Sequence, residues 1–475
     1  MNFREALGKK VLFLDGGMGT LLQARGLKSG EFPETWNVNR PEDVMEIHRD
    51  YLKAGADIIL ANTFGANGIK YKENLEELVT AGVRNAKKVV SECGREAFVA
   101  LDMGPTGKLL KPMGTLDFED AVALYREVAS IGAKAGADLI VIETMSDTYE
   151  LKAAVLGAKE GADLPIIATV VFGDGGKMLT GASPEAVVAL LEGLQVDVIG
   201  MNCSLGPKQM KPIFEKMAAV ASVPLVISPN AGLPRTENGH TVYDVTPQGF
   251  AEIMEELVHM GAWIVGGCCG TTPEHIKETV DKCHGLEVKP LTDKNITMVS
   301  SYSQVVVFGE DEVIIGDCLN PAKEPEAKEA LEDHDLDYVL DEADAQADDG
   351  AEILGISVDV PGLDQVQMIE DVIVELQSLN DTPLQIKTAD MAVMEKAMRI
   401  YNGKPMIYSV SGKEEEMEQV LALVQKYGGT VMLLLQDKDY AVITEKIYKI
   451  AEQYGVARKD ILLDAPDGEK LWRNL

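Results

Sequence analysis

The stretch Met260-Gly-Ala-Trp-Ile-Val-Gly-Gly-Cys-Cys-Gly270 contains the repeating unit from which the fold of this chain is read. Met260-Gly261-Ala262 is a typical helix ending, because glycine readily adopts the left-handed conformation that closes a helix. The apolar run after it predicts a buried strand at Trp263–Cys268, and its glycines lead into a loop. The same order of helix, small residues, strand and polar loop recurs through residues 1–285.

Eight short apolar runs in this region are strand candidates, and helical patterns separate most of them. They are Val11–Asp15, Ile58–Asn62, Phe98–Asp102, Leu139–Glu143, Ile166–Val171, Val198–Asn202, Leu225–Pro229 and Trp263–Cys268. Eight strand–helix units within fewer than 300 residues is the count of a (β/α)8, or TIM, barrel. We therefore predict an α/β fold that begins with a complete barrel in residues 1–285.

The alternation of predicted strands and helices stops at residues 286–311, which we interpret as a linker. A second series of strands and helices fills residues 312–475. Its helices are predicted at Ala327–Gly350 and Lys413–Tyr427, among others. Its strands are predicted at Val313–Asp317, Ile353–Val358, Leu384–Thr388, Met406–Val410, Val431–Leu435 and Ile461–Asp464. Because a barrel of this type needs eight strands, about six strands predict an incomplete α/β barrel or an open sheet.

Composition narrows the class of protein. The 475 residues carry a formal net charge of −33, which argues against nucleic acid as a partner because phosphate binding needs clustered Lys and Arg. The sequence shows no secretion signal and no apolar stretch of the ~20 residues that span a bilayer. Its six cysteines lack the spacing of a disulfide framework. We expect a cytoplasmic protein that does not bind membranes.

Three cysteines follow predicted strands of the barrel. Cys203 follows the sixth strand, and Cys268 and Cys269 follow the eighth. Active sites of such barrels lie at the carboxyl ends of the strands, so the three sulfurs should meet there. Three thiolates with an open fourth position are typical of a catalytic zinc site. Ordinary buried cysteines are the alternative.

The turn after the first strand reads Asp15-Gly16-Gly17-Met-Gly-Thr. It lacks the lysine of a P-loop and the spacing of a dinucleotide fingerprint. Its free amide groups could instead hold a carboxylate, while Asp15 and Glu143 could accept hydrogen bonds from an ammonium group. This combination suits the head group of an amino acid. A salt bridge within the rim is the alternative role for Glu143.

These motifs together resemble the homocysteine S-methyltransferase family, and within it most of all the N-terminal half of cobalamin-dependent methionine synthases. The resemblance rests on Asp15-Gly-Gly-Met-Gly-Thr, Asn62-Thr-Phe-Gly-Ala-Asn, Asn202-Cys203 and Gly266-Gly-Cys-Cys-Gly-Thr-Thr-Pro-Glu-His275-Ile. It implies that the three cysteines hold Zn2+ and that homocysteine sulfur takes the fourth position. Asn230 would be the fourth ligand without substrate. Substrate would be bound by Asp15, Gly16, Gly17, Thr63, Glu143 and Asn202.

The second series resembles the pterin-binding barrel that follows this domain in methionine synthases, but with changes at the binding motifs. Gly355 and Ser357 stand where the family has Asp and Asn, and Lys387-Thr-Ala replaces Asp-Ser-Ser. Asn320, Asp359 and Asp464 remain as a degenerate pterin site. Unpaired edges of a buried ring cost about 1–3 kcal/mol each, so we do not expect tetrahydrofolate to bind. A scaffold that binds a partner protein fits better.

We therefore expect a zinc-dependent methyltransferase that forms methionine from homocysteine or a related small thiol. The Asp-x-His-x-x-Gly signature of a cobalamin module is absent, so methylcobalamin should arrive on a corrinoid protein supplied in trans. One alternative is a small donor such as S-methylmethionine or betaine. Another is a non-catalytic zinc adaptor within a methyl-transfer complex. The sequence leaves all three open.

Overall fold

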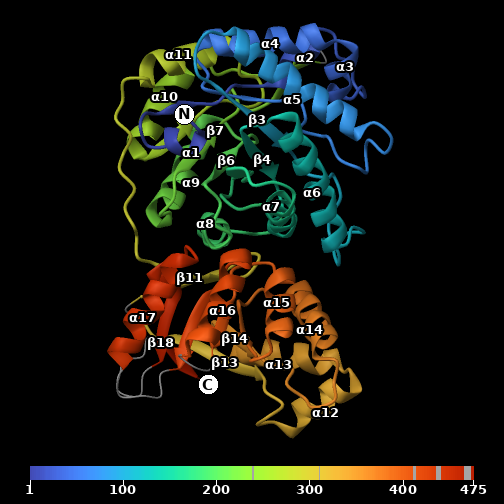
Figure 1. Cartoon of the computed structure of the whole chain (residues 1–475), viewed down its shortest axis with the longest axis vertical. Coiled ribbons are helices and arrows are strands. Elements are labelled where there is room, and N and C mark those ends of the chain that lie inside the picture. Colours follow the sequence, from blue (N-terminus) through green and yellow to red (C-terminus); the bar gives the residue numbers. More distant parts are fainter. Residues whose placement is uncertain (238–239, 310, 410–412, 435–439, 465–471, 475) are drawn as a thin grey trace. The chain divides into compact units, whose positions relative to one another are not determined.

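The structure is a computed structural model that describes residues 1–237, 240–309, 311–409, 413–434, 440–464 and 472–474. The chain divides into two compact units (Figure 1). Unit 1 consists of Met1–Thr180 and Val196–Asp293, and unit 2 of Gly181–Gln195 and Lys294–Leu475. The domain boundaries placed at residues 285 and 312 from the sequence stay a prediction.

Unit 1 contains an eight-stranded, wholly parallel sheet, which confirms the predicted barrel. Its strands are β1 (Leu12–Phe13), β2 (Ile58–Leu60), β3 (Phe98–Met103), β4 (Leu139–Met145), β5 (Ile166–Val170), β6 (Val198–Asn202), β7 (Leu225–Ser228) and β10 (Ala262–Val265). The spatial order is β1-β10-β7-β6-β5-β4-β3-β2. A parallel bridge between Leu14 and Ile58 joins the two ends and closes the barrel.

A helix follows each barrel strand. These are α4 (Pro41–Ala54), α5 (Leu75–Glu92), α6 (Phe118–Ala135), α7 (Thr148–Gly161), α8 (Pro184–Gly193), α9 (Pro207–Val220), α10 (Pro247–Met260) and α11 (Pro273–Cys283). The glycines after α4, α6 and α10 have positive φ, at 109°, 102° and 125° for Gly55, Gly136 and Gly261. The predicted left-handed helix endings are therefore confirmed.

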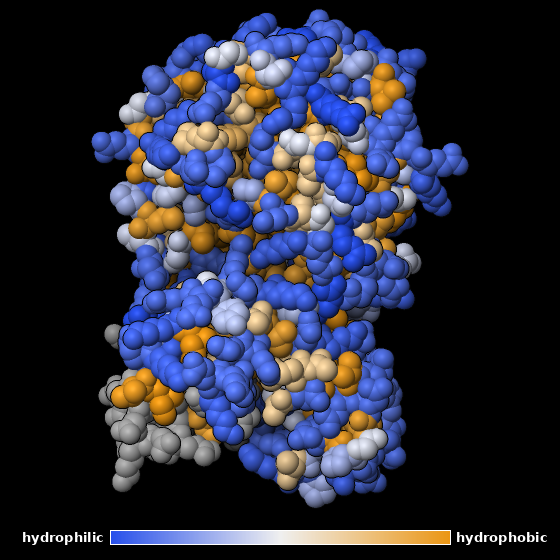
Figure 2. Space-filling model, in the orientation of Figure 1, coloured by the Kyte–Doolittle hydropathy of each residue, from blue (hydrophilic) through white to orange (hydrophobic). Residues whose placement is uncertain are grey.

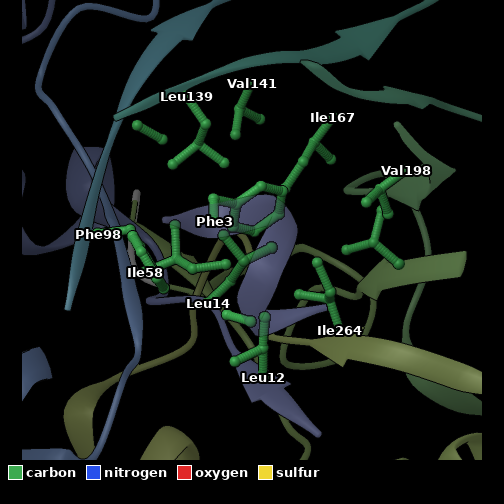
Figure 3. Packing of buried hydrophobic residues seen from close by; sticks show 13 residues of the cluster. Phe3, Leu12, Leu14, Ile58, Phe98, Leu139, Val141, Ile167, Val198 and Ile264 are labelled. Carbon is green, nitrogen blue, oxygen red and sulfur yellow. The ribbon is translucent and has the colours of Figure 1, made fainter. Parts of the chain in front are cut away.

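The barrel interior is packed with apolar side chains, and a short N-terminal helix adds to it. Phe3 of α1 (Phe3–Ala6) lies among the inward-facing residues of the strands (Figure 3). Its ring meets that of Phe98 edge to face, with centroids 5.7 Å apart. Leu139, Val141 and Ile167 belong to the same cluster. Because this filled core leaves no channel, chemistry is confined to the loops at the strand ends.

Unit 2 contains a second parallel sheet, as expected for an incomplete pterin-binding-like barrel. Its strands, in spatial order, are β18 (Ile461–Asp464), β17 (Thr430–Leu434), β16 (Met406–Ser409), β15 (Leu384–Lys387), β14 (Ile353–Ile356), β13 (Val313–Leu319) and β19 (Trp472–Asn474). The first six are the strands predicted from the sequence, and β19 adds a seventh beside β13. Of the residues assigned to the linker, part forms an antiparallel hairpin of β11 (Thr297–Ser300) and β12 (Val305–Phe308).

The helices of unit 2 confirm one prediction and correct another. They are α12 (Pro325–Asp333), α13 (Leu336–Asp348), α14 (Gln365–Leu379), α15 (Met391–Ile400), α16 (Glu414–Tyr427) and α17 (Tyr440–Gln453). The single helix predicted at Ala327–Gly350 is wrong, because His334 adopts a left-handed conformation with φ 57° and ends α12. Asp335 then caps α13 by accepting a hydrogen bond from the Tyr338 amide.

The face of the molecule shown in Figure 2 is mainly hydrophilic, with scattered apolar residues. Among the helices that the structure describes, none combines the length and the apolar character needed to cross a bilayer.

Candidate active site and metal centre

The three cysteines predicted to meet do so at the carboxyl ends of the barrel strands. Cys203 follows β6, and Cys268 and Cys269 lie three and four residues after the end of β10, with β7 between the two strands. The sulfur atoms of the three residues all lie within 4.8 Å of one another. The Sγ atoms of Cys203 and Cys269 are 3.9 Å apart.

The backbone turns sharply to bring these sulfurs together. Cys203 and Ser204 both have positive φ, at 56° and 63°. Such conformations cost side-chain-bearing residues of order 1–3 kcal/mol and concentrate at functional sites. Hydrogen bonds hold the turns in place, since the Cys203 amide donates to the Ser228 carbonyl at 3.0 Å and the Cys268 amide to the Pro229 carbonyl at 2.8 Å. The loop after β7 thus links the two cysteine turns.

The three thiols share negative charge unequally. Hydrogen bonds from Cys268 and Cys269 lower the pKa of Cys203 to about 3. The same contacts raise the pKa of Cys268, and of Cys269 to about 12. Cys203 is therefore the thiol of the three that ionises most readily. A bound cation would displace the protons of the other two, since metal binding deprotonates cysteine ligands.

The residues present fit a zinc ion. Zinc–sulfur bonds of ~2.3 Å in a tetrahedral site place sulfurs about 3.8 Å apart, close to the separation of Cys203 and Cys269. Asn230 is 3% exposed, and its side chain helps to lower the pKa of Cys203. Its Oδ1 atom has no hydrogen-bond partner within the described part of the chain. A buried oxygen without a partner is costly, so a cation at this point would satisfy it.

A cavity of about 240 Å³ opens beside the sulfurs. It is lined by the loop after β1, including Asp15, Gly16 and Gly17, and by Glu143 and the three cysteines. The remaining lining residues are Leu14, Met18, Gly19, Thr20, Pro33, Glu34, Leu60, Ala61, Asn62, Phe64, Asp102, Thr144, Ser228 and Gly267. Asn230, the predicted fourth ligand, is not among the lining residues. The structure brings the three predicted cysteine ligands and the predicted amino-acid-binding residues to one cavity, with exceptions at Thr63 and Asn202.

Those two residues support the cavity from behind. The Thr63 hydroxyl is fully buried and donates to the Asp102 carbonyl at 2.8 Å. The Asn202 Nδ2 atom lies 3.3 Å from Glu143 Oε2, 2.8 Å from Thr144 Oγ1 and 3.8 Å from Cys268 Sγ. Asn202 therefore joins the carboxylate side of the cavity to the thiol side.

Three carboxyl groups face this cavity, and none of them has a cationic partner within the part of the chain that the structure describes. Burial raises the pKa of Asp15 and of Asp102, and it raises the pKa of Glu143 to about 8, with a further contribution from the charge at Cys203. One oxygen of Asp15 accepts from the Leu60 amide at 2.9 Å. One oxygen of Asp102 has no partner among the residues described. A ligand with an ammonium group would supply the missing donor and positive charge.

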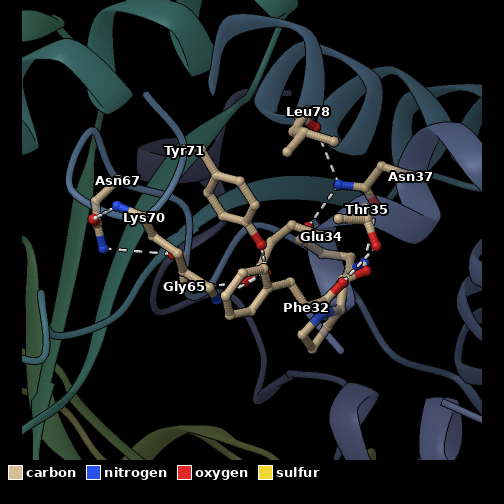
Figure 4. Close-up of polar contacts among 11 residues, drawn as sticks. Phe32, Glu34, Thr35, Asn37, Gly65, Asn67, Lys70, Tyr71 and Leu78 are labelled. Atoms are coloured by element: carbon tan, nitrogen blue, oxygen red, sulfur yellow. Dashed lines mark hydrogen bonds and ion pairs between the residues drawn. The ribbon is translucent and has the colours of Figure 1, made fainter. Parts of the chain in front are cut away.

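Glu34 is a lining residue that the sequence analysis missed. Its buried carboxylate accepts hydrogen bonds from the Gly65 amide at 2.6 Å, from Lys70 Nζ at 3.1 Å and from the Tyr71 hydroxyl (Figure 4). Lys70 also lies over the rings of Phe32 and Tyr71, 4.5 and 5.1 Å from their centroids. No motif marks Glu34, because its partners lie more than 30 residues away along the chain.

The corresponding strand ends of unit 2 hold an ion-pair network. Asp317, in β13, accepts hydrogen bonds from Asn320 and Lys323 at 2.8 Å and from Lys387, the last residue of β15. Burial alone would raise the pKa of Asp317, but these hydrogen bonds outweigh it and lower the pKa to about 2. Gly355 lies under Lys387, since a Cβ atom there would be 2.5 Å from Lys387 Nζ.

These residues do not fit a pterin. Asn320 donates a hydrogen bond to Asp317. Asp359 is exposed and accepts a hydrogen bond from Gln365 at 3.2 Å. Asp464 ends β18, but its side chain lies outside the described residues. The charges of Asp317 and Lys387 at the strand ends of β13 and β15 thus neutralise each other, so the Asp317 carboxylate is already paired.

Known proteins resemble the chain in both halves. The family model for homocysteine S-methyltransferase matches residues 12–283, and that for pterin-binding enzymes matches residues 316–468. The methionine synthases of Mycobacterium tuberculosis and Mycobacterium leprae are 32% and 30% identical to this chain, over 97% of the length of the chain. The chain spans 42% of the length of each of these relatives.

A solved structure matches unit 1. The metallated form of the homocysteine methyltransferase MmuM from Escherichia coli is 25% identical, with a TM-score of 0.50, over 58% of this chain and 96% of that protein. The family model covers more than half of the present chain. The chain therefore belongs to the homocysteine S-methyltransferase family of methyltransferase enzymes.

Proposed function

We propose that this protein transfers a methyl group to the thiol of homocysteine, which yields methionine, and that it does so with zinc. The observation that carries the proposal is the meeting of three cysteine sulfurs with a cavity lined by Asp15 and Glu143. The metallated state of the related MmuM structure supports a metal in this family. All six cysteines are free thiols, which suits a reducing cytoplasm.

In this proposal Cys203, Cys268 and Cys269 hold the ion, and Asn230 supplies the fourth ligand in the absence of substrate. When bound, zinc would keep a substrate thiol ionised near neutral pH. The three anionic ligands would leave that sulfur electron-rich and suited to accept a methyl group. The strained turn at Cys203 fixes the direction of its sulfur in advance, so little reorganisation is needed when substrate binds.

The remaining residues would orient the amino acid. Gly16 and Gly17 line the cavity and bring the backbone of the β1 loop close to the substrate carboxylate. Asp15 and Glu143 would pair with its ammonium group. Asn202 would hold the Glu143 carboxylate in position from behind, and Thr63 would fix the backbone of the neighbouring strand through Asp102.

We propose a methylcorrinoid carried on a separate protein as the donor. Phe64 lines the cavity, but Phe32 and Tyr71 do not and are already engaged by Lys70, so these three rings form no open cage for a quaternary ammonium donor. Unit 2 would bind no pterin, because Lys387 and Lys323 already pair with the Asp317 carboxylate at its strand ends. It would instead serve as a scaffold for the donor protein.

A small methyl donor such as S-methylmethionine is the second candidate. It is favoured by the similarity to MmuM, because a match over 58% of this chain covers 96% of that homocysteine methyltransferase. A single barrel of this family is therefore enough for an enzyme with homocysteine as acceptor.

The test is methyl transfer from free methylcobalamin to homocysteine by the zinc-loaded protein. We expect loss of the methyl–cobalt absorbance together with formation of methionine. Cys268→Ala should abolish both, while Cys93→Ala, a free thiol outside the cavity, should leave them unchanged. Methionine formed only from S-methylmethionine or betaine would replace the corrinoid with a small donor. No turnover with any donor, despite zinc binding, would favour a zinc adaptor.

A further inference from the structure

A lysine ammonium group lies between two aromatic rings and a buried carboxylate beside the cavity (Figure 4). Lys70 Nζ is 4.5 Å from the ring centroid of Phe32 and 5.1 Å from that of Tyr71. It is also 3.1 Å from Glu34 Oε2. The two rings meet edge to face, with centroids 5.6 Å apart. Aromatic faces bind ammonium groups in proteins, and a carboxylate adds the opposite charge. Phe32, Glu34 and Tyr71 therefore make up a cation site that a lysine of the same chain fills.

The local backbone presents the lysine to this site. Asn67 Oδ1 accepts hydrogen bonds from the amides of Ile69 and Lys70 at 3.1 and 3.0 Å. The Tyr71 amide donates to the Asn67 carbonyl at 2.9 Å. Gly65 leaves room for the ammonium group, because a Cβ atom there would be 2.5 Å from Lys70 Nζ. The turn at Asn67 and the absent side chain at residue 65 thus set the position of the lysine.

Glu34 belongs both to this site and to the cavity. Its side chain is 3% exposed, and it lines the cavity together with Pro33 and Phe64. Of the four carboxyl groups in the lining, it is the one that has a cationic partner among the described residues. A positively charged molecule that reaches this wall meets a carboxylate that Lys70 has already neutralised and rings that Lys70 already covers.

We propose that Lys70 acts as a built-in ligand of the cation site formed by Phe32, Glu34 and Tyr71, and that it thereby excludes cationic methyl donors. The excluded class consists of small molecules with a sulfonium or quaternary ammonium group, which the same rings and carboxylate would bind. Lys70 is then a specificity-determining residue. The effect on the choice of donor rests on the proposed function, whereas the cation site itself does not.

The test removes the lysine and offers the vacated site a separate cation. Lys70→Ala should bind choline at least about tenfold more tightly than the wild-type protein, measured by calorimetry without zinc or homocysteine. It should bind 3,3-dimethyl-1-butanol, which has the shape of choline without the charge, more weakly than choline. Lys70→Met fills the space with an uncharged chain and should gain no choline binding. The matched control is Lys87→Ala, which breaks an ion pair with Asp138 of 2.9 Å outside the cavity lining and should gain none either.

A second variant covers the case in which Lys70→Ala does not fold, since a buried carboxylate without its partner is costly. Lys70→Ala combined with Glu34→Gln carries no unpaired charge and keeps both rings. It should bind choline more tightly than the wild-type protein, and less tightly than Lys70→Ala. The inference is overturned if neither variant binds choline more tightly than the wild-type protein.

Methyl transfer supplies the second readout. From S-methylmethionine, the methyl carbon would bond to the homocysteine thiolate and leave the sulfonium sulfur, which keeps the electron pair as methionine departs. In zinc-loaded Lys70→Ala, the rate with this donor relative to the rate with methylcobalamin should rise about tenfold over wild type. An unchanged ratio, or a wild-type protein that prefers S-methylmethionine, would overturn the role in donor choice. A wild-type protein without turnover from any donor would instead overturn the proposed function, and choline binding would still test the cation site.

Discussion

At the scale of single residues, Glu143 shows how the cavity is prepared for a charged ligand. Burial, and then the charge at Cys203, raise the pKa of its carboxyl to about 8. A carboxyl with a raised pKa is neutral below that value and ionised above it. An ammonium group binds the ionised form, so the empty cavity must lose a proton before it pairs with an amino acid at neutral pH.

This gives a pH dependence with a definite sign. Binding of norleucine, an amino acid without a thiol, to the metal-free protein should strengthen from pH 6 to pH 7.5, by up to about tenfold per pH unit. Calorimetry at several pH values would measure it. Glu143→Gln should bind more weakly and lose most of the pH dependence. A wild-type affinity that stays constant over this range would contradict the role given to Glu143.

Gly270 and Tyr243 form a pair whose coupling can be measured. Gly270→Ala should weaken zinc binding for two reasons. The new methyl group strains the backbone at residue 270, which is left-handed, and it displaces the Tyr243 ring, which lies on this glycine. In a Tyr243→Ala background only the backbone strain remains, so the same change should cost less. A double-mutant cycle on zinc affinity isolates the difference. Equal costs in both backgrounds would show that the ring does not press on residue 270.

At the scale of elements, the sequence predicts regular structure well where local patterns determine it. All eight barrel strands were predicted, and the glycine endings of α4, α6 and α10 explain why. The strand predicted at Trp263–Cys268 ends at Val265, because Gly266 and Gly267 begin the turn that brings both cysteines to one side. The break at His334 was missed, since no glycine or proline marks it.

The residues of the candidate site could likewise be predicted only where a local sequence motif marks them. The cysteines and the Asp15 loop stand in recognisable motifs at strand ends, so their meeting could be predicted. Glu34 and Tyr243 lie in loops without a periodic pattern. Glu34 accepts a hydrogen bond from Tyr71, and the Tyr243 ring lies on Gly270, where a Cβ atom would be 2.3 Å from the ring. Their side chains have no local signature, and only the folded chain shows which groups they touch.

The left-handed break between α12 and α13 can be tested by substitution. His334→Gly and His334→Ala both remove the imidazole, which lies 3.7 Å from Asp371. Glycine tolerates φ 57°, whereas alanine does not, so the glycine variant should be more stable by about 1 kcal/mol. Urea unfolding would measure the difference. An alanine variant as stable as the glycine variant would show that the break relaxes into a continuous helix.

At the scale of the whole molecule, segment 181–195 lies between β5 and β6 in sequence but packs within unit 2. Its helix α8 is mostly apolar, with Ala186 to Leu191 all buried, as is typical of a helix covered on most of its surface. Glu192 pairs with Lys459 at 2.6 Å, with both side chains at most 7% exposed. Gln195 donates to the Tyr454 carbonyl at 2.9 Å.

A fragment of residues 1–293 would keep all eight barrel strands but lose these partners of α8. We expect it to self-associate and to unfold at a lower temperature than the full chain, because Glu192 and apolar side chains of α8 become exposed. Size-exclusion chromatography and thermal unfolding would measure both. A fragment of residues 1–309 keeps the β11–β12 hairpin that contacts α8, and should associate less. A monomeric, equally stable short fragment would refute this expectation.

The contact between Gly355 and Lys387 constrains how this protein can change over evolutionary time. A side chain at residue 355 would meet the flexible end of Lys387, which can move aside, and would lie 3.0 Å from the Gly316 carbonyl. An acidic residue there would compete with Asp317 for Lys387, whereas loss of Lys387 by itself removes a partner of Asp317. A return to the pterin-binding motif at residue 355 therefore also redistributes the charges around Asp317, so positions 317, 355 and 387 are expected to change together.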